Sequence, residues 1–300
     1  MSLTIDKLSS AAANWSIEVT PAGASKVESF ADVLEPQTCV NVTFLPGSDP
    51  ADTLAVACRL HEEGMIPIPH IAARSIKDKA HLQDIISALA KQAYVSEVLV
   101  IGGGVDKPVG KFDSSIQILK SGILQSNGIF KIGVAGHPEG SPDISNDAVR
   151  QALHEKNELA VKENLQMYIE TQFCFEADMV LEWEKRVRED GNQLPIRIGI
   201  PGPATIKTLF RFAQISGIGP SIKFITKQAR NVAKLMTVQS PDLLLSGLAE
   251  GMAADHQCLI KHFHYYPFGG FVKTAKYAKA ISDGNVHLSP KGGFEILEVQ

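Results

Sequence analysis

The sequence lacks the features of several large classes of protein. Its 300 residues contain no apolar stretch that approaches the roughly 20 residues of a transmembrane helix. Its net charge of -4 comes without any run of basic residues, which argues against nucleic acid or an anionic membrane as the main partner. Cysteines are few and far apart, so we expect buried free thiols at Cys39, Cys58, Cys174 and Cys258.

Motifs that bind dinucleotides, nucleoside triphosphates or zinc are also missing. No Gly-x-Gly-x-x-Gly run or Walker loop occurs, and no histidines or cysteines have the spacing of a zinc site. The first residues, MSLTIDKLSSAAANW, differ from a secretory signal peptide because no long apolar segment follows a basic start. We therefore expect a cytoplasmic enzyme without a metal centre.

What the sequence does contain is a regular alternation of short apolar runs with helical patterns. The runs are rich in Val, Ile, Tyr and Phe and are too short for helices, so they predict strands. We expect strands at residues 15–19, 38–44, 66–70, 97–101, 131–135, 167–173, 196–200 and 262–266. Until the last interval, strand ends fall about 25–40 residues apart, the length of one strand–helix unit, which indicates parallel strands.

Two of the intervening segments show helix signals clearly. In DPADTLAVACRLHEEG, Asp49 is placed as an N-cap before Pro50 in the first turn, and Gly64 is placed as the helix stop. In IKDKAHLQDIISALAKQA, Lys77, Asp78 and Lys79 begin an exposed face. The apolar face of that second helix is formed by Ile76, Leu82, Ile85, Ile86 and Leu89.

Eight strand–helix units fit a closed (β/α)8 barrel, the α/β fold called a TIM barrel, better than an open doubly wound sheet, which is the alternative. The long last interval predicts two successive helices, over residues 220–238 and 241–260. No Ser- or Pro-rich linker divides the chain. We therefore expect a single domain over residues 1–300, with a short N-terminal extension over residues 1–14.

In such barrels the chemistry takes place at the C-terminal ends of the strands. The residues at those positions are polar or permissive: Glu18, Thr43, His70, Gly102–Gly104, Ala135, Gly136, His137, Gln172, Gly199–Pro201 and His264. Each has a purely structural alternative. Glu18 fits a solvated outer face equally well, and Gln172 fits a hydrogen-bond network in the core. Their shared position on one rim favours a binding site.

The order of several short motifs resembles the 5,10-methylenetetrahydrofolate reductase family. The motifs are IEVTP, VTF, PHIAAR, VAGHPEGSPD, TQFCF, IGIPGP and HFHYYPFGG, and they span about residues 15–280. The resemblance implies a (β/α)8 barrel that holds FAD noncovalently. It also implies hydride transfer from NADH or NADPH to FAD and then to methylenetetrahydrofolate, giving 5-methyltetrahydrofolate for one-carbon metabolism and methionine biosynthesis. Family resemblance favours a homo-oligomer.

The resemblance implies roles for three residues that would bind and activate the folate. Glu18 occupies the place of the family's catalytic glutamate. As a general acid it would protonate the leaving nitrogen and open the imidazolidine ring to a 5-iminium cation, which accepts hydride. A carboxylic acid in a partly dry pocket can remain protonated for this purpose. Gln172 matches the family's pterin-binding glutamine, because an amide both donates and accepts, and Phe173 beside it would also contact the substrate.

The resemblance also implies a set of residues that would bind FAD. They are Thr43, His70, Gly102, Gly103, Gly104, Ala135, Gly136, His137 and Lys156. Gly136 would let the backbone approach the cofactor closely, and His137 stands where the family often has an aromatic residue. Lys156 lies on the following helix, near basic positions that the family uses toward the cofactor phosphates.

One departure from the family keeps alternatives open. The segment IGGGVDKP stands where the family usually carries Arg-Gly-Asp, so both side chains are missing in register, and Asp106 follows shortly. The first alternative to an FAD-dependent reductase is a flavin-independent enzyme, in which reduced nicotinamide hands hydride directly to the activated folate. The second is a non-catalytic folate-binding barrel.

Overall fold

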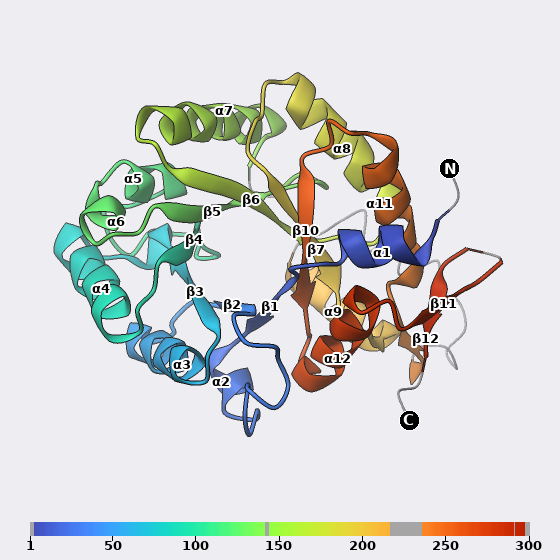
Figure 1. Cartoon of the computed structure of the whole chain (residues 1–300). Coiled ribbons are helices and arrows are strands. Elements are labelled where there is room, and N and C mark those ends of the chain that lie inside the picture. Colours follow the sequence, from blue (N-terminus) through green and yellow to red (C-terminus); the bar gives the residue numbers. More distant parts are fainter. Residues whose placement is uncertain (1–2, 142–143, 217–235, 291, 298–300) are drawn as a thin grey trace. The chain divides into compact units, whose positions relative to one another are not determined.

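The structure is a computed structural model of the whole chain, and it describes residues 3–141, 144–216, 236–290 and 292–297. Eight parallel strands form a closed barrel in the order β1-β10-β7-β6-β5-β4-β3-β2 (Figure 1). The strands are β1 (Ser16–Val19), β2 (Cys39–Val42), β3 (Ile66–Ala72), β4 (Glu97–Ile101), β5 (Lys131–Gly136), β6 (Gln166–Phe173), β7 (Ile196–Pro201) and β10 (Ile260–Tyr266). All eight predicted strands are confirmed, and the closed order excludes the open doubly wound sheet.

Helices alternate with these strands along the chain. They are α1 (Ile5–Ala11), α2 (Pro21–Ala24), α3 (Pro50–Glu62), the 3-10 helix η1 (Ala73–Ser75), α4 (Lys79–Gln92), α5 (Ser115–Leu119), α6 (Ile123–Ser126), α7 (Asn146–Lys162), α8 (Ala177–Glu189), α9 (Ile206–Ile215), α11 (Asp242–Ala254) and α12 (Phe271–Ser282). The described helices include none that combines the length and hydropathy needed to cross a bilayer.

The long last interval contains one of its two expected helices within the described residues. The helix expected over residues 241–260 is α11, which ends earlier because β10 begins at Ile260. Of the helix expected over residues 220–238, residues 220–235 lie outside the described residues. Its last residue, Val238, belongs instead to the two-residue strand β9 (Val238–Gln239), which pairs with β8 (Ala204–Thr205).

The ends of α3 follow the local sequence signals. The Asp49 side chain accepts a hydrogen bond from Ala51 N at 2.9 Å, and Pro50 occupies the first turn, where no intrahelical N–H is needed. After the helix, Gly64 adopts a φ of 85°, a left-handed conformation that glycine enters without strain. Both predicted caps of this helix are therefore confirmed.

The start of α4 differs from the prediction. The helix begins at Lys79, and Asp78 is its N-cap, accepting from His81 N at 2.8 Å, rather than part of its exposed face. Ile76 is buried but precedes the helix. The buried positions of α4 are Leu82, Ile86 and Leu89, and Ile85 of the predicted face is only half-buried. The capping aspartate thus shortens the predicted helix at its start.

The chain groups into two compact units. The first comprises Met1–Trp15, Gly136–Gln151 and Thr171–Gln300, and the second comprises Ser16–Ala135 and Ala152–Glu170. The expectation of a single domain over the whole chain stays a prediction, and each unit is described separately below.

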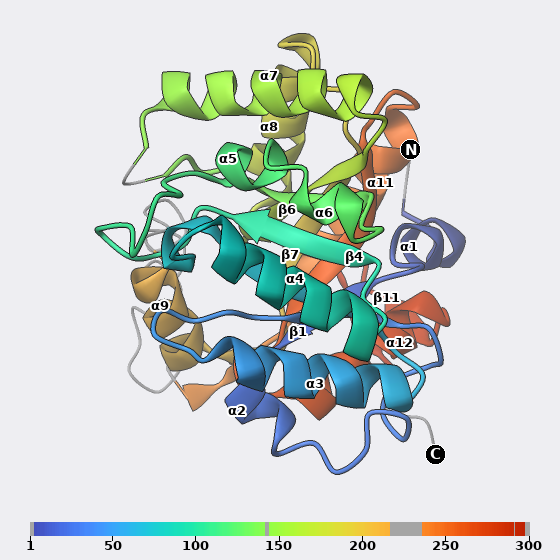
Figure 2. The ribbon, with the colours of Figure 1, turned by 90° about the vertical axis from the view of Figure 1, so that its left-hand side faces the viewer.

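In the second unit, the interior of β4 to β6 is filled below the strand ends. The Lys131 ammonium pairs with the buried Glu97 carboxylate at 2.7 Å near the start of β4 and β5. Above them, a Cβ on Gly133 would lie 2.7 Å from side-chain atoms of Leu99 and Tyr168. Only glycine therefore leaves room for the Tyr168 ring, and the interior is packed rather than open at this level. On the outside of the strands, α3, α4 and α6 lie next to one another (Figure 2).

The first unit contains β7 and β10, which pair in parallel register, and a hydrophobic cluster in which partly buried aromatic residues pack against the buried Phe173. It also contains an antiparallel hairpin that the sequence did not predict, β11 (Val286–Leu288) and β12 (Phe294–Ile296). These two strands are three residues long, which is too short for an alternation pattern to stand out.

Candidate active site

The candidate acid Glu18 lies on β1 directly beside Asn41 of β2. The two residues are partners in the parallel register of these strands, and Glu18 is half-buried. Partners in adjacent parallel strands leave the sheet on the same face. Glu18 and Asn41 therefore share one face of the sheet, and the solvated outer position for Glu18 is the less suitable interpretation.

Asn41 connects two further polar side chains across the inside of the second unit. Its Nδ2 donates to Glu170 Oε1 at 2.5 Å and lies 3.3 Å from His70 Nε2. Asn41 is fully buried, Glu170 is 3% exposed and His70 is 8% exposed. Burying a carboxylate and an amide together is unfavourable unless each is hydrogen-bonded, so this arrangement specifies side-chain positions closely. We call these three residues the Asn41 cluster.

Sequence reasoning found His70 but missed Asn41 and Glu170. Each stands in a strand whose neighbours are apolar, in CVNV and YIETQF, where a polar residue is normally assigned to the solvated face. The available signal was the position of each residue relative to the predicted site. Glu170 precedes Gln172 by two residues and therefore shares its strand face, and Asn41 has the same relationship to Thr43.

Two polar atoms on β2 and just after it have no hydrogen-bond partner among the described residues. They are Asn41 Oδ1 and Thr43 Oγ1, and both atoms are buried. Thr43 extends the strand, because its N donates to Val19 O at 2.9 Å. Buried polar atoms in folded proteins are rarely left unpaired, and functional sites account for many of the exceptions. These atoms fit a polar edge of a bound ring.

The three glycines after β4 bring backbone close to the end of β3. Gly102 O accepts from Arg74 N at 2.9 Å, and a Cβ on Gly102 would meet no atom within 4 Å. Gly103 has a φ of 100°, and a Cβ there would lie 3.2 Å from Ala72 Cβ. Gly104 faces Pro46 loosely, and Asp106 is exposed. The run therefore leaves open space beside the backbone at the end of β4, and a role for it in flavin binding stays a prediction.

Lys156 is buried on α7, with 7% of its surface exposed. Burial disfavours the ammonium form and lowers its pKa from 10.5 to about 8, against the opposing effect of Glu155. No hydrogen bond or ion pair of its ammonium occurs within the part of the chain that the structure describes. An anionic ligand at this position would compensate for the burial, which fits the expected contact with phosphate.

In the first unit, Gln172 and Phe173 end β6. Gln172 Oε1 accepts from Phe173 N at 3.2 Å, which leaves the amide N–H groups of Gln172 outside this contact. Phe173 is 2% exposed, and its ring packs edge-on against Phe175, Tyr266 and Phe268 with centroids 4.9–5.9 Å apart. Phe173 thus anchors an aromatic cluster. The prediction that Gln172 and Glu18 hold one pterin between them stays a prediction.

The loop after β5 contains the remaining candidate residues. Ala135 is a half-buried residue of β5 in the second unit, and Gly136 ends that strand. His137 is half-buried, and its carbonyl oxygen accepts from Gly140 N at 3.1 Å in a tight turn. This turn reverses the chain direction shortly after the strand. Gly140 adopts a φ of 78° there, a left-handed conformation that glycine enters without strain.

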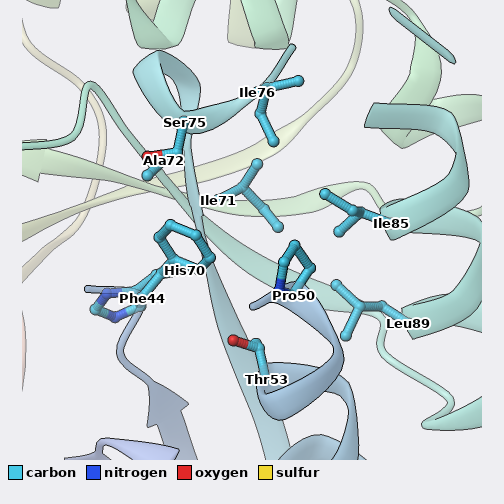
Figure 3. A pocket seen from close by; sticks show the side chains of 10 residues that line it. All are labelled: Phe44, Pro50, Thr53, His70, Ile71, Ala72, Ser75, Ile76, Ile85 and Leu89. Atoms are coloured by element: carbon cyan, nitrogen blue, oxygen red, sulfur yellow. The ribbon is translucent and has the colours of Figure 1, made fainter. Parts of the chain in front are cut away.

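An apolar pocket of about 20 Å³ lies between α3, β3 and α4 (Figure 3). Its lining includes Thr53, Ile71, Ile85 and Leu89. His70 also borders it, but the imidazole nitrogens point away from these side chains (Figure 3). The pocket is large enough for about one water molecule, and of the Asn41 cluster only His70 is in its lining.

Comparison with known proteins finds one matching family model and several similar solved structures. The family model described as methylenetetrahydrofolate reductase matches residues 5–227. A structure from Clostridium thermocellum, described as an uncharacterized protein that binds two copies of 5-methyl-5,6,7,8-tetrahydrofolic acid, superposes with a TM-score of 0.54 at 12% identity, covering 88% of this chain and 95% of that chain. Deoxyribose phosphate aldolase from Aeropyrum pernix gives a TM-score of 0.38 at 14% identity, covering 86% and 96%.

Proposed function

The chain belongs to the methylenetetrahydrofolate reductase family, and on this premise we propose that it reduces 5,10-methylenetetrahydrofolate to 5-methyltetrahydrofolate with hydride from NADH or NADPH. The observation that carries this proposal is the position of Glu18. It is a half-buried carboxyl group on the first barrel strand, and it shares a face with the buried Asn41 cluster. The folate-binding structure from C. thermocellum, which has the same fold, supports the substrate class.

Glu18 supplies the proton that the reaction needs. The methylene bridge of the substrate accepts hydride only after its ring opens, so the leaving nitrogen must take a proton. The bond between that nitrogen and the bridge carbon then breaks with its electron pair going to the nitrogen, and the lone pair of the other nitrogen forms the double bond of the iminium cation. The resulting 5-iminium cation accepts hydride and becomes the 5-methyl group. General acid catalysis of this kind contributes about 10²–10⁴ in rate. Gln172 would hold the pterin through its amide, which donates and accepts hydrogen bonds.

We further propose that the protein holds FAD, which when bound would carry the hydride between nicotinamide and folate. The residues at the strand ends fit a flat polar ring. Thr43 Oγ1 is a buried atom without a partner among the described residues, and Gly102 leaves open space beside the backbone. His70, Ala135, Gly136 and His137 would surround the ring, and Lys156 would meet the phosphates.

A second candidate is a reductase without flavin, and the Gly102–Gly104 run is the observation that favours it. These positions carry no side chain to contact an isoalloxazine, and Asp106 beyond them is exposed. In that enzyme the nicotinamide would deliver hydride directly to the activated folate. Glu18 and Gln172 would keep the same roles.

One experiment separates these candidates. The protein is purified without added cofactor and denatured, and released flavin is measured by its visible absorbance. The native protein is then mixed with NADH without oxygen, and methylenetetrahydrofolate is added. Bleaching by NADH and recovery by the folate support the FAD enzyme. Folate reduction without any flavin supports the second candidate. Folate binding with no turnover under either condition overturns both and supports a non-catalytic barrel. The expected homo-oligomer, cytoplasmic location and role in methionine biosynthesis stay predictions.

A further inference from the structure

The Asn41 amide is held in one orientation by Glu170. The 2.5 Å contact between Asn41 Nδ2 and Glu170 Oε1 requires a donor facing the carboxylate. In the opposite orientation the amide oxygen would face Glu170 Oε1, and two acceptors cannot share a hydrogen bond. Asn41 is fully buried and Glu170 is 3% exposed, so bulk solvent does not relieve that conflict. The carboxylate therefore determines which atom Asn41 presents to its other neighbour.

That neighbour is His70 Nε2, 3.3 Å from the same Asn41 Nδ2. An amide NH₂ group has two hydrogens, so one serves Glu170 and the second faces the imidazole. His70 Nε2 must then accept, which places the imidazole proton on Nδ1. A protonated imidazolium would set Nε2–H against the Asn41 N–H, donor against donor. The Glu170 charge acts in the other direction, because a nearby anion favours a cation.

We give the hydrogen-bond contact more weight than the charge because the same atom, Asn41 Nδ2, contacts both groups. Glu170 Oε1 already receives a hydrogen bond from this nitrogen, which lies 3.3 Å from His70 Nε2. Among the described strand residues, the acidic groups on this face are Glu170 on β6, Glu18 on β1 and Glu97 on β4. Glu97 lies near the start of its strand and is paired with Lys131, and the β4 residue in register with His70 is Leu99. Imidazole orientation is commonly set by the hydrogen bond that one ring nitrogen makes.

From this geometry we propose that Glu170 is a positioning residue. Acting through Asn41, it holds His70 as a neutral imidazole with its proton on Nδ1, near the end of β3. The consequence of this positioning for catalysis rests on the proposed function. A neutral His70 keeps positive charge away from the place where the folate becomes a cation, and its fixed ring gives FAD and folate a preformed contact surface.

The first test reads the tautomer directly. The full chain is labelled with ¹⁵N-histidine, and the His70 signals are assigned by their loss in His70→Gln. We expect a protonated Nδ1 and an unprotonated Nε2 in the unmodified chain at neutral pH. A protonated Nε2 or an imidazolium overturns the proposal, whatever the activity of the protein. Glu170→Gln retains an acceptor for Asn41 but no charge, so we expect it to keep the same tautomer. A change of protonation state in this variant overturns the proposal.

The second test measures ligand binding. Glu170→Leu removes the acceptor, so we expect mixed His70 tautomers and about tenfold weaker binding, measured separately for FAD and for 5-methyltetrahydrofolate, as for loss of one hydrogen bond. Glu170→Gln should bind both within about twofold of the parent. Asn192→Ala, which removes another buried asparagine whose side chain exchanges two hydrogen bonds with the backbone of Leu194, is the control for stability. Equal losses in both Glu170 variants overturn the proposal. The expected tautomer without binding of either ligand supports the positioning of His70 and overturns the proposed function instead.

Discussion

Glu18 and Asn41 are register partners on β1 and β2, and Asn41 donates a hydrogen bond to Glu170. Two carboxyl groups thus flank one buried amide on the same face of the sheet. Their surroundings differ: Glu18 is half-buried, whereas Glu170 is 3% exposed and hydrogen-bonded to the amide. The accessible carboxyl suits proton transfer to a substrate, and the enclosed one suits the positioning of its neighbours.

Replacing Glu18 tests the assignment of the acid. Glu18→Gln keeps the shape of the side chain but removes its acidic proton, so folate reduction should fall by about 10²-fold or more. Reduction of bound flavin by NADH needs no acid from Glu18 and should stay within twofold of the parent. The two half-reactions are measured separately by stopped-flow absorbance. Glu28→Gln, an exposed position in the same unit, is the control. Parental folate reduction in Glu18→Gln contradicts the assignment.

Substitutions at two adjacent glycines distinguish an effect on ligand binding from an effect on stability. A methyl group at position 102 would enter open space, so Gly102→Ala should unfold at nearly the parental temperature and yet bind FAD more weakly, because the methyl occupies the ring site. Gly103 has a φ of 100° and close contact with Ala72, so Gly103→Ala should lose about 1–3 kcal/mol of stability. Thermal unfolding and FAD titration of both variants give the comparison. Unchanged FAD affinity in Gly102→Ala would place the ring elsewhere.

The strands could be predicted because apolar β-branched and aromatic residues report burial directly. The helix ends were predictable where a capping residue stands beside proline or glycine, as at Asp49 and Gly64, and less so at Asp78, which resembles a surface charge. Residue type and strand spacing were sufficient for these elements. The short hairpin of β11 and β12 contains too few residues for either signal.

The site was only partly predictable, because strand order and register decide which of its side chains lie next to one another. Glu18, Thr43 and His70 could be selected from their places at strand ends. Asn41 and Glu170 are 129 residues apart in the chain, and no local pattern shows that their side chains meet. A buried polar pair of this kind depends on which strands are neighbours and on how they are staggered, which the sequence of either strand alone does not contain.

Gln172 is predicted to bind the pterin. Gln172→Leu removes the amide, and unpaired polar groups on the folate should weaken its binding by about 5–30-fold, equivalent to about 1–2 kcal/mol. The maximal rate of flavin reduction by NADH should be unaffected. Folate affinity is measured by quenching of intrinsic fluorescence, with Gln214→Leu at an exposed position of α9 as the control. Equal folate affinity in Gln172→Leu and the parent would remove Gln172 from the binding site.

Lys156 should make the stability of the protein depend on pH in the alkaline range. Burial lowers its pKa from 10.5 to about 8, so between these values the unfolded chain binds the proton and the folded chain does not. The free energy of unfolding therefore rises with pH in this window, by about 2 kcal/mol between pH 7 and pH 9.5. Below pH 8 the lysine is charged in both states, and the full unfavourable effect of its burial remains.

Lys156→Met should abolish this alkaline rise and stabilise the protein at pH 7, because a methionine has no charge to bury. Urea unfolding of both proteins at the two pH values measures the difference, and Lys162→Met, at an exposed position of the same helix, should behave like the parent. If FAD phosphates meet Lys156, saturating FAD should favour its charged form and reduce the rise in the parent. Equal pH dependence in the parent and Lys156→Met would show that Lys156 is not buried, and a rise that FAD leaves unchanged would remove Lys156 from the phosphate site.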